Sequence, residues 1–174
     1  MRKPRWWWWP ALIVAAMFVA ALLPLPWLVV LEGDHMRYAF PGTTGTAFVL
    51  RWTHSVEKED WEERFQIQPD GGLMLVETRF KTFGAGVPAR VGQQTRLENG
   101  WVVMSGIKRA VDPLNVQAAA AANYRLRYRG WTLALARPGV PPILTFTTRD
   151  APLLTMLPAL LRGTQCFSAV WRGP

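Results

Sequence analysis

The chain has 174 residues, of which half are hydrophobic, with a formal net charge of +8 and a single cysteine. This length has room for one domain and a small appendage, and the lone Cys166 excludes an intrachain disulfide. The basic residues are scattered and no nucleic-acid-binding motif is present, so we expect no nucleic-acid partner.

The first apolar segment, residues 6–23, has 18 residues and no charged side chain. As a helix it would be about 27 Å long, close to the roughly 30 Å thickness of a bilayer core. Basic residues at positions 2, 3 and 5 precede it, which predicts a cytoplasmic N-terminus and a periplasmic main domain at a bacterial inner membrane. The alternative is a cleaved signal peptide, but the apolar stretch is long for one and no Ala-x-Ala site follows it. We therefore predict residues 1–26 to be a cytoplasmic stub and a single transmembrane anchor.

Residues 27–148 alternate apolar with polar side chains between turn signals, which is typical of short strands. We predict strands over residues 27–31, 36–40, 47–56, 61–68, 73–82, 91–98, 101–107, 124–128, 131–136 and 142–148. Asp112-Pro113 resembles a helix start, so a short helix is predicted from there to Asn123. The fold class is mainly β: an antiparallel β-sandwich or a partly open barrel with one short helix.

Residues 149–174 form a C-terminal extension with an apolar run that is too short and too interrupted by proline to span a bilayer. We expect it to lie on the membrane surface or to dock on a partner.

A histidine and a glutamate mark the predicted hairpin of residues 47–68. If the turn spans residues 57–60, His54 lies opposite Glu63 on an otherwise apolar face. Such a pair is a structural buried contact, a polar floor for a ligand or partner, or, least in favour, a catalytic pair. Ser55 points to the other face and cannot serve His54 as a nucleophile, while Glu57 belongs to an acidic tip.

A glycine-rich segment follows the next strand. Gly84, Gly86 and Pro88 are typical of a structural turn, or of a loop whose backbone N–H groups bind an anion. The nearby basic residues that would contact an anion are Arg79, Lys81 and Arg90. Two histidines and one cysteine give no zinc-like spacing, so we expect no metal, no cofactor and no catalytic residue.

Four sequence features together resemble a bacterial family of small single-anchor extracytoplasmic domains. They are His54-Ser55-Val56-Glu57, Glu63, the run Leu75-Val76-Glu77-Thr78-Arg79-Phe80 and Phe83-Gly84-Ala85-Gly86-Val87-Pro88. Genes of this family commonly lie beside those of TAXI-type TRAP transporters. The residues carried over from the resemblance are His54, Ser55, Glu57, Glu63, Gly84, Gly86 and Pro88.

The resemblance implies a non-enzymatic accessory subunit of a TAXI-type TRAP transporter, in contact with its permease or its solute-binding protein. The alternative is a membrane-tethered domain that binds a small acidic solute or a lipid head group through the glycine-rich loop. An enzyme comes third, because Ser55 points away from His54 and neither Ser105 nor Ser168 lies in a nucleophile-elbow sequence.

Overall fold

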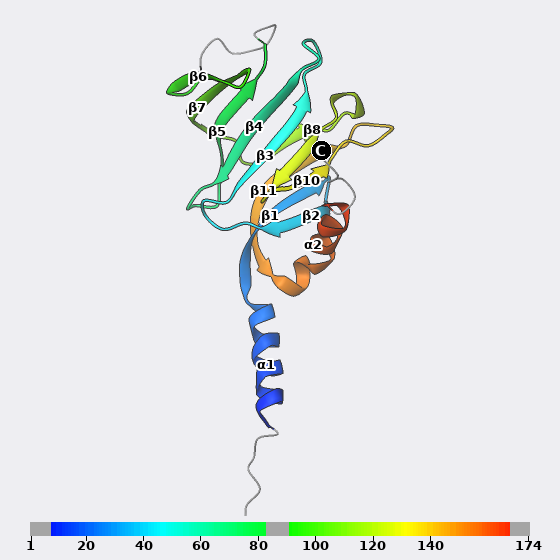
Figure 1. Cartoon of the computed structure of the whole chain (residues 1–174). Helices are drawn as coiled ribbons and strands as arrows, with labels where there is room; N and C mark the ends of the chain where they lie inside the picture. Colours follow the sequence, from blue (N-terminus) through cyan, green and yellow to red (C-terminus); the bar gives the residue numbers. More distant parts are fainter. Residues whose placement is uncertain (1–7, 83–90, 168–174) are drawn as a thin grey trace, which may run out of the picture.

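The computed structural model describes residues 8–82 and 91–167 (Figure 1). The strands of this part pair into two sheets, both antiparallel, so the predicted mainly β class is confirmed. In chain order the elements are α1 (Trp8–Leu22), β1 (Pro24–Glu32), β2 (His35–Pro41), β3 (Ala47–Thr53), β4 (Asp60–Ile67), β5 (Leu73–Phe80), β6 (Gln94–Glu98), β7 (Trp101–Ala110), β8 (Leu114–Gln117), the 3-10 helix η1 (Ala120–Ala122), β9 (Arg125–Tyr128), β10 (Trp131–Ala134), β11 (Ile143–Pro152) and α2 (Leu153–Phe167).

Helix α1 has 15 residues, all uncharged, and none of them is buried. Figure 1 shows it projecting from one end of the β domain. The helix ends at Leu22 and β1 begins at Pro24, as proline's fixed φ and missing N–H lead one to expect. In the part of the chain described above, no helix is both long and apolar enough to cross a membrane.

The smaller sheet has four strands in the order β2-β1-β11-β8. Its first hairpin is the predicted one, with Leu28 opposite Phe40. Strand β11 pairs with β1 along its whole length, from Pro24 opposite Pro152 to Glu32 opposite Leu144. Strand β1 is therefore paired with β11 from its first residue, directly after α1, and with β2 from Trp27 onwards.

The larger sheet has seven strands in the order β10-β9-β3-β4-β5-β7-β6. Two of its hairpins turn at the predicted dipeptides, Asn99-Gly100 between β6 and β7 and Arg129-Gly130 between β9 and β10. All four residues have positive φ values, the conformation that two-residue hairpin turns require.

The two sheets pack face to face, so the fold is the predicted sandwich and not a barrel. Phe146 of the small sheet stacks on Phe48 of the large sheet with ring centroids 5.7 Å apart, and Phe48 stacks on Phe65 at 5.2 Å. Leu28 and Val30 from β1 are fully buried in the same core. Alternation of side chains along each strand places these apolar residues on the inner faces.

Helix α2 covers the outer face of the small sheet. Its Met156 and Ala159 pack with Trp27 and Val29 of β1, whose side chains point away from the main core. The described helices leave the outer face of the large sheet uncovered, and α2 reaches only its edge strand β10. That uncovered face is where charged side chains gather.

The short helix predicted from Asp112 to Asn123 is wrong. Strand β8 occupies residues 114–117 and pairs with β11, with Val116 opposite Leu144. Only the three residues of η1 are helical. In β8 the side chain of Val116 is buried while its neighbours Asn115 and Gln117 are exposed, as in a strand at the edge of a sheet. Pairing of this strand with β11 outweighs the helix propensity of the alanines that follow it.

Candidate functional site

The predicted pairing of His54 with Glu63 is wrong, because Leu50 lies opposite Glu63. The hairpin closes at Thr53 opposite Asp60, which leaves a connection of residues 54–59 in place of a tight turn. This register places Trp52 opposite Trp61, and the two indoles stack at 5.7 Å with an interplanar angle of 15°. Stacking of two large aromatic side chains outweighs the contact of Val56 with Trp61 that the predicted register required.

His54, Ser55 and Glu57 all lie in this connection. The backbone N–H of His54 donates to the carbonyl of Glu59 at 2.8 Å, and the N–H of Glu57 donates to Nδ1 of His54 at 3.4 Å. The imidazole stacks on Trp61 with centroids 5.3 Å apart. His54 is therefore the outermost member of an aromatic row that continues through Trp61 and Trp52.

Glu63 lies on the same side of the sheet as Trp61, two residues further along β4. Burial raises the pKa of its carboxyl group, and the positive charge of Arg109 offsets part of that rise. Tyr124, which stacks on Trp52 at 5.5 Å, has its own pKa raised by burial and by the charge of Glu63. The glutamate thus stands apart from His54, in a setting that favours its neutral form.

Most of the predicted glycine-rich anion site lies beyond the part of the chain that the structure describes. Gly84, Gly86, Pro88 and Arg90 lie outside the described residues. The other two predicted anion contacts, Arg79 and Lys81, belong to the outer side of the large sheet.

Both of these basic residues already have acidic partners. Nη2 of Arg79 is 2.5 Å from Oε2 of Glu62, and Nζ of Lys81 is 3.1 Å from Oε2 of Glu59. Both cations also lie over the ring of Trp101, at 4.9 Å and 5.6 Å from its centroid. An incoming anion would have to compete with these carboxylates.

Glu62 is the centre of a charged cluster that sequence reasoning missed. Its side chain is only 4% exposed, yet Arg51, Arg79 and Arg127 all contact its carboxylate. The register explains this meeting, since Arg51 and Arg79 lie directly opposite Glu62 on the two neighbouring strands. Arg127 reaches it from β9, one strand further along the sheet. The signal in the sequence is the alternating charge on the face of the hairpin opposite its apolar face, where Arg51, Glu62 and Arg64 lie.

The charged cluster extends towards the β6 edge. Arg96 contacts Glu98 at 2.5 Å and Glu77 at 3.5 Å, and its Nη1 donates to Oγ of Ser105 at 2.8 Å. A cavity of about 120 Å³ opens within the cluster, lined by Val49, Glu62, Arg64, Glu77, Arg79 and Arg127. The side chain of Arg64 makes no hydrogen bond or ion pair with any residue that the structure describes.

This outer face, from Arg51 to Arg127, has the chemistry of a recognition surface. Guanidinium groups bind carboxylates and phosphates through paired hydrogen bonds, and here their positions are fixed by a desolvated glutamate. The cavity is too small for more than a single functional group of a partner. In the described ranges, no three His, Cys, Asp or Glu side chains gather closely enough to hold a metal ion.

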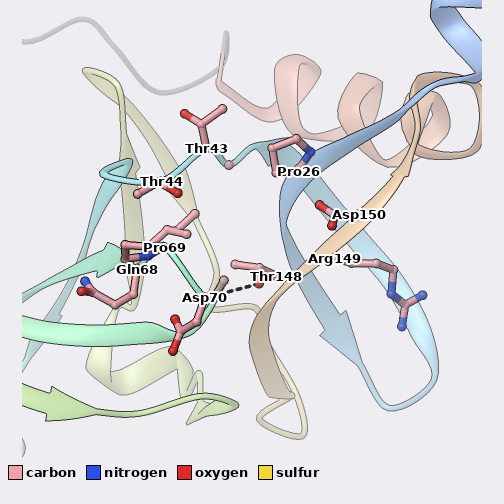
Figure 2. A pocket seen from close by; sticks show the side chains of 12 residues that line it. Pro26, Thr43, Thr44, Gln68, Pro69, Asp70, Thr148, Arg149 and Asp150 are labelled. Atoms are coloured by element: carbon pink, nitrogen blue, oxygen red, sulfur yellow. Dashed lines mark hydrogen bonds between the residues drawn. The ribbon is translucent and has the colours of Figure 1, made fainter.

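A second, larger cavity of about 480 Å³ lies where β1 begins (Figure 2). Figure 2 shows Thr43, Gln68 and Asp150 around it, with Thr148 donating to the backbone carbonyl of Gly71 at 2.6 Å. Hydroxyl, amide and carboxylate groups line this cavity, which suits a polar ligand. None of the residues predicted as a site lies there.

The family comparison concerns the large sheet. A family described as a domain of unknown function (DUF1850) matches residues 48–135, just over half of the chain. This range takes in all seven strands of the large sheet and therefore the whole charged outer face. No match is found among curated proteins or solved structures. The chain belongs to the DUF1850 family.

Proposed function

We propose that this protein is a non-enzymatic, membrane-tethered accessory subunit that holds its β-sandwich beside a TAXI-type TRAP transporter. The observation that carries the proposal is helix α1, which is uncharged and buries no residue. An apolar helix that packs into no core needs another apolar environment, and a bilayer provides one.

The anchor in this proposal is α1 together with the residues that precede it. A helix of 15 residues is about 22 Å long, and the sequence adds Trp6 and Trp7 before it and Leu23 after it. Arg2, Lys3 and Arg5 favour a cytoplasmic N-terminus, which places the sandwich in the periplasm of a bacterial inner membrane.

The partner surface in this proposal is the uncovered outer face of the large sheet. A tether raises the effective concentration of the sandwich near a membrane partner, so a weak contact is sufficient. The paired arginines and glutamates fix the charge pattern of this face and therefore select a complementary partner. The resemblance of the sequence to proteins encoded beside TRAP transporters supports the permease or the solute-binding protein as that partner.

Binding of a small acidic solute is the second candidate, and Arg64 favours it. This guanidinium lines the cavity of about 120 Å³ without a partner in the described part of the chain. Against it, Arg79 and Lys81 are already neutralised by carboxylates. We therefore prefer a protein partner.

Co-purification tests the proposal. We expect the tagged full chain, extracted in mild detergent, to retain the co-expressed permease or solute-binding protein. Arg64→Glu reverses the charge beside the cavity and should abolish this retention. Arg129→Glu makes the same change on an exposed side chain in the β9–β10 turn, which lines neither of the two cavities described above, and should leave it intact. Absence of both transporter subunits from the wild-type eluate would refute the proposal, and a melting temperature raised by a small carboxylic acid would favour the second candidate.

A further inference from the structure

Helix α2 presents an exposed apolar stripe that no contact described above uses. Leu154, Leu157 and Leu161 are spaced three and four residues apart and therefore lie on one face of the helix. They are 43%, 39% and 49% exposed, while Met156 and Ala159 on the opposite face are buried against the small sheet. The helix thus has two apolar faces, of which the sandwich covers one.

The first turn of α2 lies beside the point where α1 leaves the domain. Pro24 is opposite Pro152, and Leu25 is opposite Ala151, so the last residues of β11 return the chain to the start of β1. Figure 1 shows α2 beginning at the end of the domain from which α1 projects. Leu23 and Leu25, which follow α1 in the chain, are two more exposed leucines at this end of the domain.

The stripe cannot turn inward, because the opposite face of α2 is fixed. Arg162 donates to the carbonyl oxygens of Met36 and Arg37, at 2.8 Å and 3.1 Å. Gly163 lies against the ring of Phe40 so closely that a Cβ there would be 2.9 Å from it. The leucines are therefore held facing away from the sandwich.

We propose that α2 rests on the bilayer surface, with Leu154 and Leu157 in the boundary between head groups and acyl chains, as a second membrane contact beside α1. The inference depends on the proposed anchoring by α1, because the stripe faces lipid only if the chain enters the bilayer at Leu22. Helix α2 contains no acidic residue, so nothing on it repels an anionic surface. Two contacts, one along α1 and one beside it, would fix the tilt of the sandwich and the direction in which the charged outer face points.

Spin labelling of the full chain in vesicles of phosphatidylcholine and phosphatidylglycerol tests this. Leu157→Cys and, as a second position, Leu154→Cys are each introduced in a Cys166→Ser background and labelled. We expect the label at both positions to collide more often with oxygen, which partitions into lipid, than with a water-soluble nickel chelate. The matched control is Leu97, another exposed leucine, on β6 of the large sheet. Its label should show the opposite ratio.

A label at Val14 of α1 tests the anchoring by α1 separately from the second membrane contact through α2. Lipid-like collisions at Val14 with water-like collisions at Leu154 and Leu157 would overturn the second contact and leave the anchor standing. Water-like collisions at Val14 would overturn the anchor and this inference together. Labels on α2 shielded from both reagents would show that a protein covers the stripe, which also overturns the inference.

Discussion

Three arginines from three strands surround the single carboxylate of Glu62. Two of these arginines make one further contact each, one with a second carboxylate and one with an aromatic ring. Arg51 also pairs with Asp60, and Arg79 lies over Trp101. The buried charge is the carboxylate of Glu62, and burying it would be costly without paired cations. The three guanidinium groups are therefore drawn towards this carboxylate. At the scale of the residue, this glutamate organises the outer face.

Glu62→Gln should lower the free energy of unfolding by about 2 kcal/mol, because it leaves three cations without their shared counter-ion. The loss is smaller than for a fully buried pair, since the side chains of Arg51, Arg79 and Arg127 are 35%, 34% and 44% exposed and can turn towards water. Urea unfolding of the two proteins measures the difference. Glu98→Gln, an exposed carboxylate beside Arg96, should change stability by less than about 0.5 kcal/mol. Equal effects of the two substitutions would contradict the central role of Glu62.

Glu63 should make stability depend on pH. Burial raises the pKa of Glu63 in the folded protein, so on raising pH the unfolded chain loses this proton first. The free energy of unfolding should therefore fall as pH rises from the ordinary pKa of a glutamate to the raised native value, and then level off. Glu63→Gln should remove this decline, which denaturant titrations at a series of pH values would reveal. A decline that persists in the variant would assign it to other groups.

Alternation along the strands predicted which residues share a face but could not predict register. A slide of one strand by an even number of residues leaves each side chain on its face. Leu50, four positions before His54, lies opposite Glu63 because the connection between the strands is longer than a tight turn. The stacking of Trp52 on Trp61 that settles the register is a contact between strands, which periodicity within either strand does not encode.

At the scale of the element, the turn dipeptides were the most informative signals. Asn99-Gly100 and Arg129-Gly130 located their hairpins because glycine, the second residue of each, readily adopts a positive φ. Strand β8 was missed because its four residues gain their conformation from pairing with β11, which lies distant in sequence. The division of the strands into two sheets depends equally on such long-range pairing.

The connection from β2 to β3, where the chain changes sheets, should tolerate no side chain at Gly42. A Cβ there would lie 2.4 Å from the backbone nitrogen of Leu28, so Gly42→Ala should cost about 3 kcal/mol or more. Gly45 in the same connection has a positive φ but open space around it, so Gly45→Ala should cost only about 1 kcal/mol. Thermal unfolding of the two variants compares them directly. A larger loss for Gly45→Ala would mean that backbone conformation outweighs the close approach.

At the scale of the whole molecule, the charged outer face and the apolar helix α1 belong to different parts of the chain. The first lies within residues 48–135, which match the family, and the second lies before them. Recognition and tethering can therefore be disrupted separately, which makes the proposed function testable in two independent ways.

Two charges in α1 should release the protein from membranes. Val14→Arg with Phe18→Arg places two guanidinium groups in the apolar helix, at a cost of roughly 2.5–3.5 kcal/mol each near a bilayer centre. We expect the wild type to stay in the pellet after alkaline extraction of membranes and the double variant to move to the supernatant. The control is Leu97→Arg with Val140→Arg, which adds the same charges at exposed positions of the sandwich. Release of the wild type itself would refute membrane tethering.

Only Leu23 separates α1 from β1, and β1 is hydrogen-bonded to β2 on one side and to β11 on the other. Antiparallel ladder bonds run perpendicular to the strands, so a pull along β1 loads the ladder to β11 from Pro24 and the ladder to β2 from Trp27, both in shear. The joint has no slack in which a displacement could be absorbed. Motion of whatever holds α1 would therefore reach the centre of the sandwich directly, and the domain would follow its tether as a rigid body.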